Sequence, residues 1–76
     1  MSKLPSVTGP EAIRAFAKAG FVVVRTRGSH HIMKKEGHEF LLSVPVHGGS
    51  CVKRGTLRSL IRGSGLTIEQ FDELLK

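Results

Sequence analysis

The hydrophobic pattern predicts a first helix that begins near Thr8 and ends at Gly20. Thr8 can cap this helix, and Glu11, three residues later, completes the sequence pattern of a capping box. Three apolar residues recur at helical spacing and form one face: Ile13, Phe16 and Ala17. We therefore expect an amphipathic helix that packs on one side only.

Three short runs rich in β-forming residues follow this helix. They predict strands over residues 21–27, 30–35 and 38–44. Tight turns are predicted between them at Gly28-Ser29 and Glu36-Gly37. Pro45 would end the third strand because it has no amide hydrogen for the ladder. Strands joined by turns this short form an antiparallel meander.

Two more helices are predicted after a Gly-rich loop that spans residues 45–54. Residues 53–62 carry an apolar face made of Leu57, Leu60 and Ile61. A second capping-box pattern at residues 67–70 opens a short helix with three apolar residues for the core: Phe71, Leu74 and Leu75. The fold class is therefore α+β, a three-stranded antiparallel sheet with the helices packed on one face. This is the layout of a double-stranded-RNA-binding-like domain, and residues 1–76 suffice for a single domain.

Charge is distributed unevenly along the chain, whose formal net charge is +6. Residues 14–62 contain ten Lys or Arg and two Glu, a balance of +8, whereas residues 63–76 have a balance of −2. A basic centre favours a polyanionic partner, of which nucleic acid is the commonest. The alternative is a solvated surface that excess charge keeps soluble.

The cysteine content favours a reducing compartment. Cys51 is the only cysteine, so no internal disulfide can form, and we expect a cytoplasmic protein. The N-terminal residues lack the apolar run of a signal peptide. No segment approaches the roughly 20 apolar residues that span a bilayer, so no membrane association is expected.

The most informative segment is Val24-Arg25-Thr26-Arg27-Gly28-Ser29-His30-His31. Its two arginines are two residues apart on a strand, so both project from one face. The two histidines are neighbours on the next strand and must point to opposite faces, so they cannot share a role. If Ile32 packs under the helices, His30 lies on that side; if Met33 does, His30 faces outward.

A histidine among cationic side chains could cleave RNA without a cofactor. Its ordinary pKa suits proton transfer near neutrality, positive charge stabilises the reacting phosphate, and RNA supplies a 2′-hydroxyl nucleophile. His30 is the catalytic candidate, and His47, in the Gly-flanked loop, is a weaker candidate for a second proton-transfer group. The candidate RNA-binding residues are Arg25, Arg27, Gly28, Ser29, Lys34, Lys35, Lys53, Arg54 and Arg58.

Simpler interpretations remain for these residues. His30 and His31 could be one solvated and one half-buried histidine, and His38, after a turn, would face water. The basic residues of the second helix could be solvated. No metal site is predicted, because two adjacent strand residues cannot reach one ion and the basic centre has only two carboxylates.

Three blocks of the sequence resemble the HicA (YcfA-like) toxin family. They are the segment described above, Val44-Pro45-Val46-His47-Gly48, and Arg54-Gly55-Thr56-Leu57-Arg58-Ser59-Leu60, in the family's order and at similar spacings. The resemblance covers residues 10–66. The chain departs from the family pattern in a longer N-terminal lead and in a last helix that extends beyond many relatives.

The resemblance implies a double-stranded-RNA-binding-like fold and a metal-independent endoribonuclease that cuts mRNA. It also implies a HicB-like antitoxin that covers the active site. The family's catalytic histidine directly follows Gly-Ser, which corresponds to His30, whereas His31 has no implied role and that of His47 is less settled. The alternative is a non-catalytic RNA-binding module on the same fold.

Overall fold

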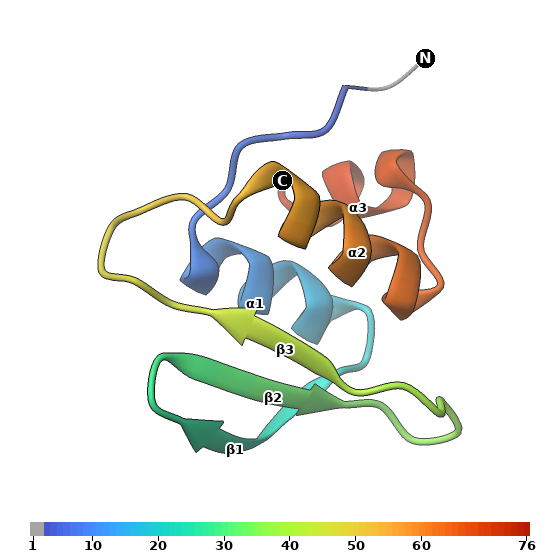
Figure 1. Cartoon of the computed structure of the whole chain (residues 1–76). Helices are drawn as coiled ribbons and strands as arrows, with labels where there is room; N and C mark the ends of the chain where they lie inside the picture. Colours follow the sequence, from blue (N-terminus) through green and yellow to red (C-terminus); the bar gives the residue numbers. More distant parts are fainter. Residues whose placement is uncertain (1–2) are drawn as a thin grey trace.

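The computed structural model describes residues 3–76; Met1 and Ser2, which the predicted single domain includes, lie outside the described residues. Three helices lie on one side of a three-stranded antiparallel sheet, over its second and third strands; the first strand is exposed along its length, and the other face of the sheet is open (Figure 1). The elements are α1 (Gly9–Lys18), β1 (Val22–Arg27), β2 (His30–Lys34), β3 (Leu42–Pro45), α2 (Arg54–Ser64) and α3 (Ile68–Leu74). The predicted fold class and element order are confirmed.

The register of the sheet decides which side chains face the helices. Strand β2 lies between the two others and pairs antiparallel with both. Met33 is completely buried, and its partner Leu42 and the nearby Val44 on β3 are buried as well. Because side chains alternate along a strand, the neighbours of these residues point to the open face. A β-bulge between Val23 and Arg25 shifts the β1–β2 register by one residue.

The third strand is shorter than predicted: β3 starts at Leu42, not at His38. The imidazole of His38 turns toward the helical layer, where its Nε2 lies 2.7 Å from the carbonyl oxygen of Gly63. The ring also packs edge-on against Phe21 at 5.4 Å. Residue 38 therefore lies outside the hydrogen-bond ladder of the sheet. The prediction that His38 faces water was wrong, because the residue is half-buried.

Helix α1 begins with the predicted capping box. The Thr8 hydroxyl accepts a hydrogen bond from the amide of Glu11, and the Glu11 carboxylate accepts one from the amide of Thr8 at 2.8 Å. Of the predicted apolar face, Phe16 is buried and Ile13 is half-buried against the core, whereas Ala17 is exposed; Ala12 and Ala15 are buried as well. The helix ends before Gly20, whose φ of 106° suits glycine.

The capping box makes stability depend on pH. The hydrogen bond from the Thr8 amide, followed by that from its hydroxyl, lowers the pKa of Glu11 below 4.5. A carboxyl with a lowered folded-state pKa stabilises the fold above its unfolded-state pKa and loses that contribution as the pH falls through the folded-state value. We expect Glu11→Gln to be less stable than wild type at neutral pH. The difference between their free energies of unfolding should disappear in acid, where Glu11 is protonated. Urea unfolding over a pH series measures this, and a gap that persists below the lowered pKa would contradict it.

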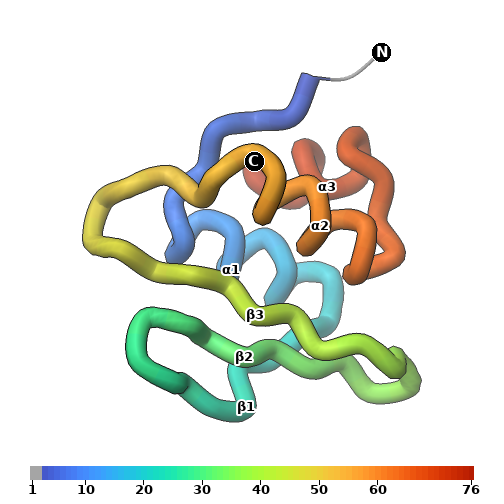
Figure 2. Tube along the Cα trace, in the orientation of Figure 1, coloured from blue at the N-terminus to red at the C-terminus, as the bar shows by residue number. Residues whose placement is uncertain are grey.

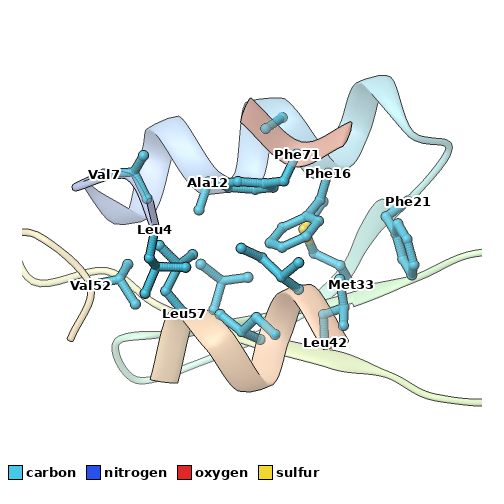
Figure 3. Close-up of a cluster of buried hydrophobic side chains, with 14 residues drawn as sticks. Leu4, Val7, Ala12, Phe16, Phe21, Met33, Leu42, Val52, Leu57 and Phe71 are labelled. Atoms are coloured by element: carbon cyan, nitrogen blue, oxygen red, sulfur yellow. The ribbon is translucent and has the colours of Figure 1, made fainter. Parts of the chain in front are cut away.

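The core lies between the sheet and the helices. Phe16, Phe71 and Met33 are completely buried and meet at its centre, with Phe21 at its edge (Figure 3). Helix α2 continues two residues past the predicted end to Ser64 and stops at Gly65, which adopts a left-handed conformation. The capping box predicted for α3 at Thr67 is confirmed. Within residues 3–76, no helix is long and apolar enough to cross a membrane.

Candidate functional site

The alternation of β2 assigns the two histidines to opposite faces. Met33 faces the helices, so His30 faces outward, and the second of the two predicted arrangements is the correct one. His31 points toward the helical layer and is half-buried. Its Nδ1 is buried and has no hydrogen-bond partner within residues 3–76. The neighbours therefore occupy different environments, as predicted.

Two arginines share the outward face with His30. Arg27 is the direct cross-strand partner of His30, and Arg25 is the partner of Ile32. Directly opposed residues of an antiparallel pair project to the same side, with Cβ atoms about 5 Å apart. The guanidinium groups of β1 therefore flank the outward face of β2, as the sequence pattern predicts.

Strand β3 fixes the orientation of the His30 ring. The Nδ1 atom of His30 and the Oγ atom of Ser43 are 3.0 Å apart. Ser43 lies between the buried residues Leu42 and Val44, so its hydroxyl points to the open face. The Nε2 atom of His30 has no hydrogen-bond partner in the described part of the chain and is directed to solvent or to a ligand.

The loop after β3 brings a second imidazole to His30. This loop and the β1–β2 turn lie at the same end of the sheet (Figure 2), where the amide of Val46 donates to the carbonyl of Ser29 at 2.6 Å. The start of α1 packs closely on this segment, since a Cβ on Gly9 would lie 2.5 Å from the carbonyl oxygen of Pro45. His47 follows, and its ring lies 6.5 Å from the ring of His30 at 90°.

A hollow of about 430 Å³ lies beside this histidine pair. Apolar Pro45 and Val52 line it together with the polar side chains of Ser50, Cys51 and Thr56. Lys53 also lines it and is the first residue before α2. Among the lining residues of the described chain there is no carboxylate, so the ionisable groups around the hollow are cationic, neutral or a thiol.

The start of α2 adds hydrogen-bond donors to this hollow. Lys53 occupies the N-cap position and makes no capping hydrogen bond through its side chain. An ammonium group can only donate, so it cannot accept a hydrogen bond from the amides of the first turn. The first intrahelical bond runs from the amide of Leu57 to the carbonyl of Lys53. The amides of residues 54–56 have no partner within residues 3–76, and the first turn contains no acidic residue. Such a helix start favours an anion.

Three of the predicted RNA-binding residues lie away from the histidine pair. Lys34 is on the outward face at the opposite end of β2, about 13 Å from His30 along the strand. The ammonium of Lys35 lies over the Phe21 ring, 5.8 Å from its centroid. Arg58 lines a different hollow, at the end of α2. The structure thus brings together Arg27, Ser29, Lys53 and the histidines, and leaves these three farther along the surface.

The sequence did not indicate the other residues around His30. They are Ser43, Ser50, Cys51, Val52 and Thr56. Strand alternation could have placed Ser43 on the face of His30 once β3 was aligned correctly. The other four come together only because the loop folds back on α1: the amide of Val52 donates to the carbonyl of Val7 at 2.7 Å, and Cys51 pairs with Thr8. No local sequence signal encodes that contact.

The fold and the site define a small basic α+β protein that presents a histidine pair at the edge of an open sheet face. Residues 9–66 match the model of the family described as HicA toxin of bacterial toxin-antitoxin systems. The chain belongs to this family, as its sequence motifs indicate. It is therefore the toxin member of a toxin-antitoxin system, which implies an antitoxin partner. No curated protein matches the chain.

Proposed function

We propose that this toxin is a metal-independent endoribonuclease that cleaves mRNA with His30 as the proton-transferring residue. One observation carries the proposal: the ring of His30, held by Ser43, lies 6.5 Å from the ring of His47 beside an open hollow that Lys53 lines. Two imidazoles at one phosphate supply the base and the acid that transesterification of RNA requires. The family supports a toxin whose target is a nucleic acid.

The proposed reaction uses the 2′-hydroxyl of the RNA as nucleophile. One histidine accepts the proton of the 2′-hydroxyl while the 2′-oxygen forms a bond to phosphorus. The bond from phosphorus to the 5′-oxygen breaks, and the second histidine donates a proton to that oxygen. We assign the first proton transfer to His30 and the second to His47. The cationic groups of Arg27 and Lys53 stabilise the negative charge that develops on the phosphoryl oxygens.

We propose that the RNA backbone crosses the open face of the sheet toward the start of α2. Arg25, Arg27, Gly28 and Ser29 hold it on one side of His30, and Lys53 and Arg54 on the other. Lys34, Lys35 and Arg58 extend the basic surface farther from the cleavage point. Binding would then weaken with rising salt, because each phosphate that is neutralised releases counterions.

The proposal extends to the partner and the compartment. A HicB-like antitoxin would neutralise the toxin by covering the open face and the hollow, because a protein seated there excludes RNA. We place the chain in the cytoplasm, where its substrate is found, and treat residues 1–76 as one domain.

Product analysis tests the proposed chemistry. Purified protein should cut a single-stranded RNA to fragments ending in a 2′,3′-cyclic phosphate and a 5′-hydroxyl, and excess EDTA should leave the rate unchanged. Substituting 2′-deoxyribose at the cleaved position should abolish the cut. Fragments with 5′-phosphates, or loss of activity in EDTA, would contradict the mechanism. Salt-dependent binding without any cut would favour a non-catalytic RNA-binding module.

A further inference from the structure

We propose that the hollow beside His30 binds one unstacked nucleotide, so that this toxin acts on single-stranded RNA although the layout of its elements is like that of a double-stranded-RNA-binding domain. The inference rests on the proposed function for the identity of the ligand as RNA. It adds a base-binding subsite to the phosphate-binding groups already described. It also restricts the substrate, because bases inside a duplex are paired and stacked.

The size and rigidity of the hollow suit a ligand of this kind. Sites for small molecules and cofactors enclose roughly 300–1,000 Å³, and this hollow measures about 430 Å³. Two other hollows of the described chain are smaller, about 130 and 260 Å³. The amide of Val52 donates a hydrogen bond to the carbonyl of Val7, and Cys51 forms an antiparallel β-bridge with Thr8. Both contacts attach the loop that lines the hollow to the residues just before α1. These contacts hold Cys51 and Val52 in the lining in the absence of a ligand.

The lining of the hollow matches the two kinds of surface that a nucleobase presents. A base has apolar faces, which stack on flat side chains, and a polar edge, which forms hydrogen bonds. Pro45 and Val52 offer apolar surface for the faces of a base. The hydroxyls of Ser50 and Thr56 line the same space and have no hydrogen-bond partner within residues 3–76. They are free to bond to the edge of a base.

The phosphate of the same nucleotide has its own groups at the border of the hollow. Lys53 and Thr56 line it, and the first turn of α2, to which Thr56 belongs, has amides without an intrahelical partner. His30 lines it too, with its Nε2 free. A nucleotide whose base enters the hollow therefore keeps its phosphate beside the groups that transfer protons.

A duplex cannot use this site without disruption. In an RNA helix each base is stacked between its neighbours, and moving one into a pocket requires breaking its pair and its stacking contacts. Single strands and loops carry no such cost, and their splayed bases are what proteins read by stacking and edge contacts. The site therefore selects unpaired RNA.

Ligand titrations followed by NMR test the inference without any cleavage. The probes are a nucleoside 3′-monophosphate, inorganic phosphate and ribose 5-phosphate, added to the wild-type chain. We expect the nucleotide to shift the amides of Ser50, Val52 and Thr56 and to bind about tenfold more tightly than the two probes without a base. A short RNA made non-cleavable by 2′-deoxyribose should shift the same amides as a single strand but not as a duplex.

A matched pair of variants on one helix supplies the control. Thr56→Leu adds apolar volume inside the hollow and removes a hydroxyl, and we expect it to weaken nucleotide binding at least tenfold. Ser59→Leu makes a comparable change at an exposed position of α2 that does not line the hollow, and should bind as wild type does. Comparison of their amide spectra with wild type verifies the fold.

The outcomes separate this inference from the proposed function. Equal affinity for nucleotide and inorganic phosphate, unchanged binding by Thr56→Leu, or equal shifts by duplex and single strand would overturn the base-binding subsite even if the protein cuts RNA. Selective nucleotide binding in the hollow by a protein that cuts no RNA would support the subsite and remove the catalytic proposal.

Discussion

The His30→Ala variant is expected to cleave RNA about 10²–10⁴-fold more slowly than wild type, the usual loss when a general acid or base is removed. The residue is exposed on the open face and packs into no part of the core, so the fold should survive. In cells, induction of wild type should arrest growth and leave cut mRNA, and induction of His30→Ala should do neither. Cleavage rates of the purified proteins, with circular dichroism as the test of folding, measure the effect.

The neighbouring histidine provides the matched control. His31→Ala removes the same side chain one residue away, on the face that points to the helices. We expect some loss of stability and a cleavage rate close to that of wild type below the melting temperature. Equal cleavage rates of wild type and His30→Ala would mean that His30 is not the residue that transfers the proton. If neither purified protein cuts RNA although both bind it, the non-catalytic RNA-binding module becomes the leading interpretation.

The elements that sequence reasoning predicted best are those whose signals are local. Each capping box, at Thr8 and at Thr67, lies within four residues and forms as predicted. The start of the third strand was predicted four residues too early, because it depends on a contact that is distant in sequence. Residues 38–41 follow a turn and include Phe40 and Leu41, which suit a strand, but His38 bonds to the carbonyl of Gly63, 25 residues away, and these residues do not join the ladder. A propensity pattern contains no information about that partner.

The site also combines features that local sequence signals predict with features that depend on contacts distant in sequence. The shared face of Arg25 and Arg27 follows from strand alternation alone. The outward position of His30 needed one more fact, the burial of Met33. The hollow could not be predicted, because the loop that lines it is positioned by the close approach of Gly9 to Pro45 and by contacts with the N-terminal segment.

Helix α3 illustrates how the fold extends beyond the family's shared region. The match to the family ends at residue 66, and α3 begins at Ile68. Phe71 nevertheless has no exposed surface, and its ring lies 5.0 Å from that of Phe16 on α1 (Figure 3). The helix therefore closes the core of this chain. Because a chain of 76 residues has few large side chains to bury, each contributes a large share of the stability.

The Phe71→Ala variant is expected to lose about 3–5 kcal/mol of unfolding free energy, the usual cost of removing a buried aromatic ring. Small domains are stable by roughly 5–15 kcal/mol, so the variant should be close to unfolding at growth temperature. Phe40→Ala is the control, because that ring is 63% exposed and should matter little. Urea titrations of the three proteins measure the differences. A Phe71→Ala midpoint close to that of wild type would mean that α3 lies on the core without stabilising it.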